Sequence, residues 1–103
     1  MSELKIYDNG NRRWYNEDGR LHRLDGPAIE WDDGSKYWFL NGNRHREDGP
    51  AVEFADGSKF WCKNGKIHRV GGPAVEDVDG YRVWYLNGVQ MTEEEFNERD
   101  RIV

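Results

Sequence analysis

The chain of 103 residues repeats itself with a period of 23 residues. This repeat constrains the fold more than any other feature of the sequence. Five landmarks recur at that interval: a His-Arg pair, Gly-Pro-Ala, Asp-Gly, a Trp and Asn-Gly. A weaker copy precedes them, with Asn9-Gly10 and Asp18-Gly19 at the places of the two turns and Trp14 or Tyr15 at that of the Trp. The sequence therefore predicts tandem units from about residue 4 to about residue 90.

Each unit contains two turn signals with short strands between them. Asp-Gly and Asn-Gly favour two-residue hairpin turns, in which both central residues need positive φ. The runs between the turns are rich in aromatic and β-branched residues, which is typical of strands. One strand follows each Gly-Pro (28–31 and 51–54), and another follows each Asp-Gly (36–40, 59–62 and 82–86). We expect a mainly β fold: tandem β-hairpin repeats that form an elongated antiparallel meander sheet.

The end of the chain departs from the repeat. Asp77 stands where the earlier units have Trp31 and Phe54, so we expect the sheet to fray there or to be covered by the tail. Thr92 and Glu95 have the spacing of a capping box, and Met91 and Phe96 that of a hydrophobic staple. We therefore expect a short capping helix over about 92–101, which covers the open apolar face of the last unit.

Segments such as 54–59 and 63–68 resemble the MORN repeat, which has the same repeat length. The resemblance is closer to a MORN-like variant of phage and giant-virus proteins, with units such as 43–51 and an ending such as 86–96. It covers nearly the whole chain and implies a single MORN-like repeat domain over 1–103, built of stacked hairpins. It also implies a role as an adaptor, a dimerisation module or a binding module. The spacing of Lys and Trp differs from the MORN core, so we expect no lipid or membrane partner.

The Trp residues that follow Asp-Gly lie on the opposite strand face from their apolar neighbours, and each comes two residues after a cation. This row is either part of a curled core or a contact surface for another protein. Aromatic and basic residues together can also stack nucleic acid bases. The formal net charge of −5 argues against a nucleic acid partner. The candidate partner-binding residues are Trp38, Trp61, Trp84, Lys36, Lys59 and Arg82.

The His-Arg pairs form a second row, with a Glu eight residues after each His. In the structural interpretation, each pair braces its own turn and pairs with the Glu of a neighbouring strand. In the alternative, the row binds a small anionic ligand or a nucleotide. We expect no metal, because a metal site needs ligands that converge on one point. The candidate ligand-binding residues are His22, Arg23, His45, Arg46, His68 and Arg69.

Little in the sequence points to catalysis. The glycines fall on turns rather than in a phosphate-binding loop, and the carboxylates are spread one per unit along the repeat. Cys62 takes the place of Phe39 and Tyr85, so we interpret it as a small core residue. We expect no enzyme, no catalytic residue and no cofactor. The acidic helix face of Glu93, Glu94 and Glu98 is either solvated or docks on a basic partner.

We therefore expect a non-enzymatic protein-binding module. The resemblance implies a small viral protein of the host cytoplasm that inhibits or occludes a host protein such as a defence nuclease, as anti-CRISPR proteins do. Exposed sheet edges also favour a homodimer. The alternatives are sequestration of a small anion on the His-Arg row and a structural or adaptor repeat protein.

Overall fold

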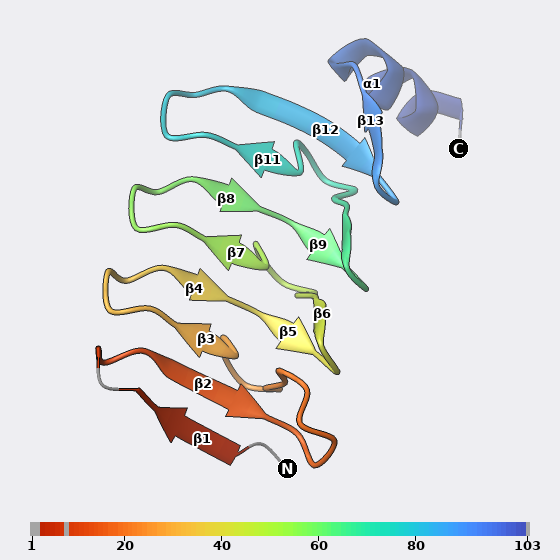
Figure 1. Cartoon of the computed structure of the whole chain (residues 1–103). Coiled ribbons are helices and arrows are strands. Elements are labelled where there is room, and N and C mark those ends of the chain that lie inside the picture. The colour runs from red at the N-terminus through yellow and green to blue at the C-terminus, as the bar shows by residue number, and fades with distance from the viewer. Residues whose placement is uncertain (1–2, 8, 103) are drawn as a thin grey trace.

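The computed structural model describes residues 3–7 and 9–102, with side chains to residue 99, and it is an open antiparallel sheet with a helix at one end (Figure 1). Nine strands lie in the order β1-β2-β3-β4-β7-β8-β11-β12-β13, and two further ladders join β5 to β6 and β9 to β10. The molecule measures 48 × 30 × 18 Å. The expected mainly β fold, an elongated antiparallel sheet of linked hairpins with a C-terminal helix, is confirmed. The elements are β1 (Glu3–Ile6), β2 (Arg12–Tyr15), β3 (Ile29–Glu30), β4 (Lys36–Tyr37), β5 (Phe39–Leu40), β6 (Asn43–Arg44), β7 (Val52–Glu53), β8 (Lys59–Phe60), β9 (Cys62–Lys63), β10 (Lys66–Ile67), β11 (Val75–Glu76), β12 (Arg82–Leu86), β13 (Val89–Met91) and α1 (Glu93–Ile102).

We refer to residues 22–44, 45–67 and 68–90, which each begin with a His-Arg pair, as the first, second and third units. The strand after each Gly-Pro joins the neighbouring units. In the second unit, Val52 of β7 lies opposite Tyr37 of β4 on one side and Phe60 of β8 on the other. Each unit therefore contributes strands whose backbone bonds reach the preceding unit as well as its own hairpin.

The strand predicted over 36–40 changes its partner at Trp38. The backbone N–H of Trp38 donates to the carbonyl of Ala51 (2.6 Å), and its own carbonyl accepts from the N–H of His45 (3.1 Å). For this reason β4 belongs to the large sheet, whereas β5 pairs with β6 in a separate hairpin. Trp38, and Trp61 in the same way, therefore lies where the chain passes from one ladder to the other.

The two turn signals form different turns. Asn41 and Gly42 have φ values of 49° and 85°, as a two-residue hairpin turn requires. In the Asp-Gly turn only the glycine has a positive φ, which is 96° at Gly34. The carboxylate of Asp33 accepts a hydrogen bond from the backbone N–H of Ser35 (2.8 Å). The prediction of a two-residue turn was wrong for Asp-Gly, because the aspartate acts through its side chain in a longer loop.

Buried polar side chains connect these loops from one unit to the next. Ser35 and Ser58 are buried. Each Oγ accepts a hydrogen bond from the backbone N–H of the following unit's loop, at 2.9 and 3.1 Å. The buried Asn11 makes the corresponding contact with its Oδ1 at 2.8 Å. These bonds satisfy backbone donors that would otherwise lie unpaired at the end of the sheet.

The core is a thin layer of small and aliphatic side chains. Ala28, Ala51 and Ala74 have no exposed surface, and they follow the proline in each unit. Val52 and Cys62 are 1% and 2% exposed. Burial raises the pKa of the Cys62 thiol. The interpretation of Cys62 as a small core residue is confirmed.

One face of the sheet carries a continuous series of aromatic rings. Trp31, Tyr37, Phe54 and Phe60 contact one another edge to face, with centroids between 5.6 and 6.1 Å apart. Each such pair contributes about 0.5–1.5 kcal/mol beyond the area that it buries. The next position in the series is Asp77, so the series ends at Phe60.

Of the two alternatives expected at Asp77, a frayed sheet or cover by the tail, the first was wrong. β11, immediately before it, pairs with both β8 and β12, and its Val75 lies opposite Phe60 and Val83. The backbone bonds on both sides fix the strand whatever side chain follows it. Asp77 interrupts the series of rings without interrupting the ladder.

Helix α1 covers the C-terminal end of the sheet. It begins with the predicted capping box: Thr92 Oγ1 accepts from the N–H of Glu95 (3.1 Å), and Glu95 Oε1 accepts from the N–H of Thr92 (2.9 Å). The Thr92 N–H lowers the pKa of the Glu95 carboxyl group. Phe96 is buried, and the helix packs on β12 and β13 (Figure 1).

Candidate functional site

Three tryptophans lie beneath arginine side chains. The guanidinium carbon is between 3.8 and 3.9 Å from the ring centroid in each pair. A cation over an aromatic ring contributes about 0.5–2 kcal/mol, depending on how far it is desolvated. The cation over each ring comes from the following His-Arg pair, not from the cation two residues before the Trp. The pairs are Trp14 with Arg23, Trp38 with Arg46 and Trp61 with Arg69.

The three predicted cations Lys36, Lys59 and Arg82 do not cover the Trp rings but lie opposite glutamates in the sheet. Lys36 and Lys59 each lie opposite two glutamates of neighbouring strands, and Arg82 lies opposite one. Opposite charges in such cross-strand positions contribute about 0.2–1 kcal/mol a pair. The predicted partner surface therefore divides into a row of Arg-covered rings and a row of alternating charges. The charged row is Arg12, Glu30, Lys36, Glu53, Lys59, Glu76 and Arg82.

The arginine of each His-Arg pair is anchored on several sides, as the structural interpretation predicts. Arg46 donates from Nε to Asp48 (3.1 Å), and from Nη1 to the carbonyl of Pro50 (3.1 Å) and to Glu53 (3.0 Å). Its side chain is 20% exposed. The pairing with Glu53 reaches from the loop to β7. Arg46 thus braces its own loop and fixes it to the sheet.

Each histidine binds the Asn-Gly turn of its own unit. In every unit the Nδ1 atom accepts a hydrogen bond from the backbone N–H of the next Asn-Gly turn, at 2.9 to 3.0 Å. An imidazole that accepts at Nδ1 is neutral and carries its proton on Nε2. Among the described residues, no group of three His, Cys, Asp or Glu side chains could hold a metal ion. The hydrogen-bonded pairs are His22 with Asn41, His45 with Asn64 and His68 with Asn87.

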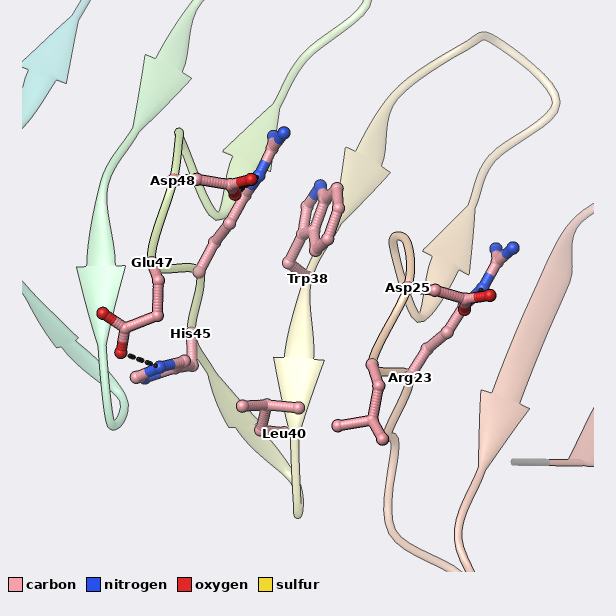
Figure 2. A pocket seen from close by; sticks show the side chains of 9 residues that line it. Arg23, Asp25, Trp38, Leu40, His45, Glu47 and Asp48 are labelled. Atoms are coloured by element: carbon pink, nitrogen blue, oxygen red, sulfur yellow. Dashed lines mark hydrogen bonds and ion pairs between the residues drawn. The ribbon is translucent and has the colours of Figure 1, made fainter. Parts of the chain in front are cut away.

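Grooves lie between successive loops. Groove 1 has a volume of about 380 Å³, lies between the loops that begin at Arg23 and Arg46, and is lined by Trp38 and Leu40. Figure 2 shows Glu47 against His45 on one wall of this groove. On the same wall Asp48 accepts a hydrogen bond from Arg46. Groove 2 is the corresponding space one unit later, about 370 Å³, lined by Trp61 and Lys63.

The two grooves differ in charge. The carboxylates of Asp25, Glu47 and Asp48 line groove 1. In the loop that begins at Arg69, Val70 and Gly71 replace the last two of these. Lys63 stands at the repeat position of Leu40, and its Nζ atom lies 3.2 Å from a carboxylate oxygen of Glu47. Lys63 and His45 hold the pKa of the Glu47 carboxyl group below its ordinary value. Groove 2 is therefore the more basic of the two.

A third hollow, of about 380 Å³, lies beside β12 at the end of the sheet and is lined by Arg82, Val83, Trp84 and the start of α1. Thr92 stands at the repeat position of Arg69, so no arginine of the His-Arg series lies over Trp84. Among the described residues, Arg82 and Val83 pair only with β11. The outer edge of this part of β12 is open, and in Figure 1 it forms the upper left margin of the sheet.

The predicted acidic residues lie on α1. Glu93 and Glu94 are exposed in its first turn, where negative charge is favourable for the helix dipole. Glu93 also lines the hollow beside β12. Glu98 is exposed further along the helix. The acidic residues and Trp84 are thus at the same end of the molecule.

Sequence reasoning missed two features of the site. One is the contact between each Trp and the Arg of the following His-Arg pair, which a constant spacing of eight residues marks at Trp38 and Trp61. The other is the loss of both loop carboxylates at Val70 and Gly71, which alignment of the units makes visible. Both signals were present in the repeat.

No family model, curated protein or solved structure matches the chain. The resemblance to MORN-like repeats stays a prediction, as do the viral source and the inhibitory role that it implies. No helix in the described part of the chain has the length and apolar character needed to cross a membrane.

Proposed function

We propose that this protein is a binding module for another protein, and that it takes up an extended segment of its partner as an additional strand on β12. The observation that supports this proposal is the open edge of β12 at Arg82 and Val83. Within the described part of the chain, Arg82 and Val83 pair on one side only, whereas their counterparts in the second unit, Lys59 and Phe60, pair on both. An unpaired strand presents backbone N–H and C=O groups that a partner strand can bond.

The strands of the chain itself indicate what kind of segment fits. The strand that occupies the equivalent edge of β8 is β11, with Val75 opposite Phe60 and Glu76 opposite Lys59. By analogy, the partner segment has an apolar residue opposite Val83 and an acidic residue opposite Arg82. Specificity comes from these two positions, while the backbone bonds supply affinity for any extended chain.

Comparison of Trp84 with Trp61 indicates a further feature of the partner segment. Arg69 covers Trp61 of the preceding unit at 3.8 Å and lies seven residues before Glu76. Trp84 has no such arginine, so a basic residue of the partner, about seven positions before its acidic residue, supplies the missing cation. The fitting segment thus has the order basic, small, apolar, acidic.

A synthetic peptide with the sequence of residues 69–76 (Arg-Val-Gly-Gly-Pro-Ala-Val-Glu) is a direct probe. We expect it to slow amide hydrogen exchange at Arg82, because strand addition places that backbone group in a hydrogen-bonded ladder. Exchange would be followed by NMR on the whole chain. Unchanged exchange at Arg82 with saturating peptide would contradict the proposal.

Matched variants locate the binding edge. Arg82→Glu places like charges opposite each other and should weaken the peptide by about tenfold. Lys5→Glu makes the same change in β1, the strand at the opposite end of the sheet, and should leave affinity unchanged. Equal effects of the two variants would show that the peptide does not bind at β12.

A further inference from the structure

The loop that begins at Arg69 lacks a partner that the preceding loop provides. Arg46 Nε donates to Asp48 at 3.1 Å. Arg69 keeps the other contacts, to the carbonyl of Pro73 (3.0 Å) and to Glu76 (3.2 Å). Gly71 stands at the position of the aspartate, so within the described part of the chain Arg69 Nε has no acceptor. A charged donor is left available at the surface of groove 2.

The neighbouring histidine has lost its partner too. His45 Nε2 lies 2.8 Å from Glu47, whereas Val70 stands at the corresponding position beside His68. The Nδ1 atom of His68 accepts from the N–H of Asn87, so Nε2 carries a proton that it can donate. Among the described residues, this N–H has no acceptor either.

Both donors line groove 2, and Lys63 adds a positive charge beside them. The carboxylates on the opposite wall of groove 2 are already engaged, since Glu47 pairs with Lys63 and Asp48 pairs with Arg46. Burial and the charge of Lys63 lower the pKa of His68, so the ring is neutral at neutral pH. The groove therefore offers one cationic and one neutral donor, in a positive field, to an anionic ligand.

We propose that groove 2 binds an acidic segment of a partner protein through two neighbouring carboxylates. One carboxylate accepts from Arg69 Nε, and the other accepts from His68 Nε2. The second unit is the template: there, Glu47 binds His45 Nε2, as Figure 2 shows, and the adjacent Asp48 binds Arg46 Nε. The ligand supplies from outside the pair of side chains that the third unit lacks.

The two donors favour a peptide over a single oxyanion. In the second unit they bind two different side chains, so each donor takes its own carboxylate. Two consecutive acidic residues can provide both at once, as Glu47 and Asp48 do in the second unit. The exposed Val70 adds an apolar surface at the rim of the groove. This site is separate from the open edge of β12 and does not depend on strand addition there.

The test uses a variant whose own side chains occupy the proposed site. Gly71 has an ordinary backbone conformation, and a Cβ added there meets nothing within 4 Å, so aspartate fits. In the double variant Val70→Glu, Gly71→Asp, the chain restores its own pair of carboxylates. The probe is the blocked tetrapeptide Gly-Glu-Asp-Gly, followed by NMR at Arg69 Nε–H and the ring of His68. We expect binding to the wild type and an affinity lower by at least about tenfold in the variant.

The converse variant and two further probes make the test decisive. Glu47→Val, Asp48→Gly should create a second site in groove 1 and raise the stoichiometry to about two peptides. The uncharged peptide Gly-Gln-Asn-Gly should not bind. Equal binding to the wild type and the filled variant would overturn the proposal. So would inorganic phosphate that perturbs both donors at the same concentration as the peptide, since the site would then take single oxyanions. The peptide of residues 69–76 has no adjacent acidic pair, so its failure at β12 leaves this result unaffected.

Discussion

The loops that follow Arg46 and Arg69 share their arginine contacts, but only the first has acidic residues at the next two positions. In both, the guanidinium covers a Trp ring (3.9 and 3.8 Å), donates to a proline carbonyl (3.1 and 3.0 Å) and pairs with a sheet glutamate (3.0 and 3.2 Å). The loop after Arg46 has the acidic residues Glu47 and Asp48, whereas the loop after Arg69 has Val70 and Gly71 at the same repeat positions. Arg69 therefore keeps these three contacts without acidic residues in its loop.

The acidic residues Glu47 and Asp48 are exposed to solvent, which explains why the loop after Arg69 can lack them. The Asp48 side chain is 84% exposed, so its pair with Arg46 is screened by water and contributes less than about 1 kcal/mol. The arginine side chains are 20% and 29% exposed and make their remaining contacts against the sheet. Positions 47–48 and 70–71 can therefore vary at little cost in stability, which leaves them available for binding.

The largest expected effect is the removal of either arginine. Arg46→Ala should lower the free energy of unfolding by about 3 kcal/mol and Arg69→Ala by about 2 kcal/mol, because each loses a cation–π contact and charge-assisted hydrogen bonds. Urea denaturation measures both. Arg44→Ala, at an exposed position of β6, is the control and should change little. If Arg46→Ala were as mild as this control, the arginines would not hold the loops.

A smaller effect is expected from the buried serine between the second and third units. Ser58 Oγ accepts from the N–H of Val78, and Ser58→Ala leaves that donor unpaired, at a cost of about 1–2 kcal/mol. Tyr81 takes the corresponding position in the third unit and is 65% exposed. Tyr81→Ala should stay within about 0.5 kcal/mol of the wild type. Equal thermal shifts in the two variants would argue against this role of the serine.

The third unit can be made more like the second. Asp77→Phe places a ring next to Phe60, where the series from Trp31 ends. We expect a gain of about 1 kcal/mol in the free energy of unfolding from the added edge-to-face contact. Asp79→Phe, in the loop beyond the strand, is the control without a ring neighbour. A loss of stability in Asp77→Phe would mean that the third unit does not share the packing of the second.

The features that the sequence predicted correctly depend on short segments. The positive φ values of Asn41 and Gly42 follow from the Asn-Gly pair itself, and the capping box of Thr92 and Glu95 spans four residues. Strand positions followed from composition between the turns. Each of these requires only local backbone geometry, which neighbouring residues determine.

The features that it could not predict depend on contacts between units. Whether Trp14 or Tyr15 takes the Trp position depends on the loop after them, which contains one residue more than its counterparts, and the ring beneath Arg23 is Trp14. The strand before Asp77 persists because backbone bonds to two other strands hold it. The open side of β12 is visible only when the pairing of every strand is known. Such relations arise when the units stack, and a single unit does not encode them.

The smallest expected effect concerns the pH dependence of the third unit. Burial and the charge of Lys63 lower the pKa of His68 from its ordinary value of 6.5, and its Nδ1 must stay unprotonated to accept from Asn87. The unfolded chain therefore binds a proton at His68 more readily than the folded chain does. The stability from this group is complete above pH 6.5 and is lost as the pH falls below that value through the lower pKa of the folded state.

We expect the thermal midpoint of the wild type to decrease between about pH 7 and pH 5. In His68→Ala the midpoint should decrease less steeply over the same range. This variant is less stable at pH 7, because the Asn87 N–H loses its acceptor. Identical slopes in the two proteins would show that His68 does not contribute to the pH dependence.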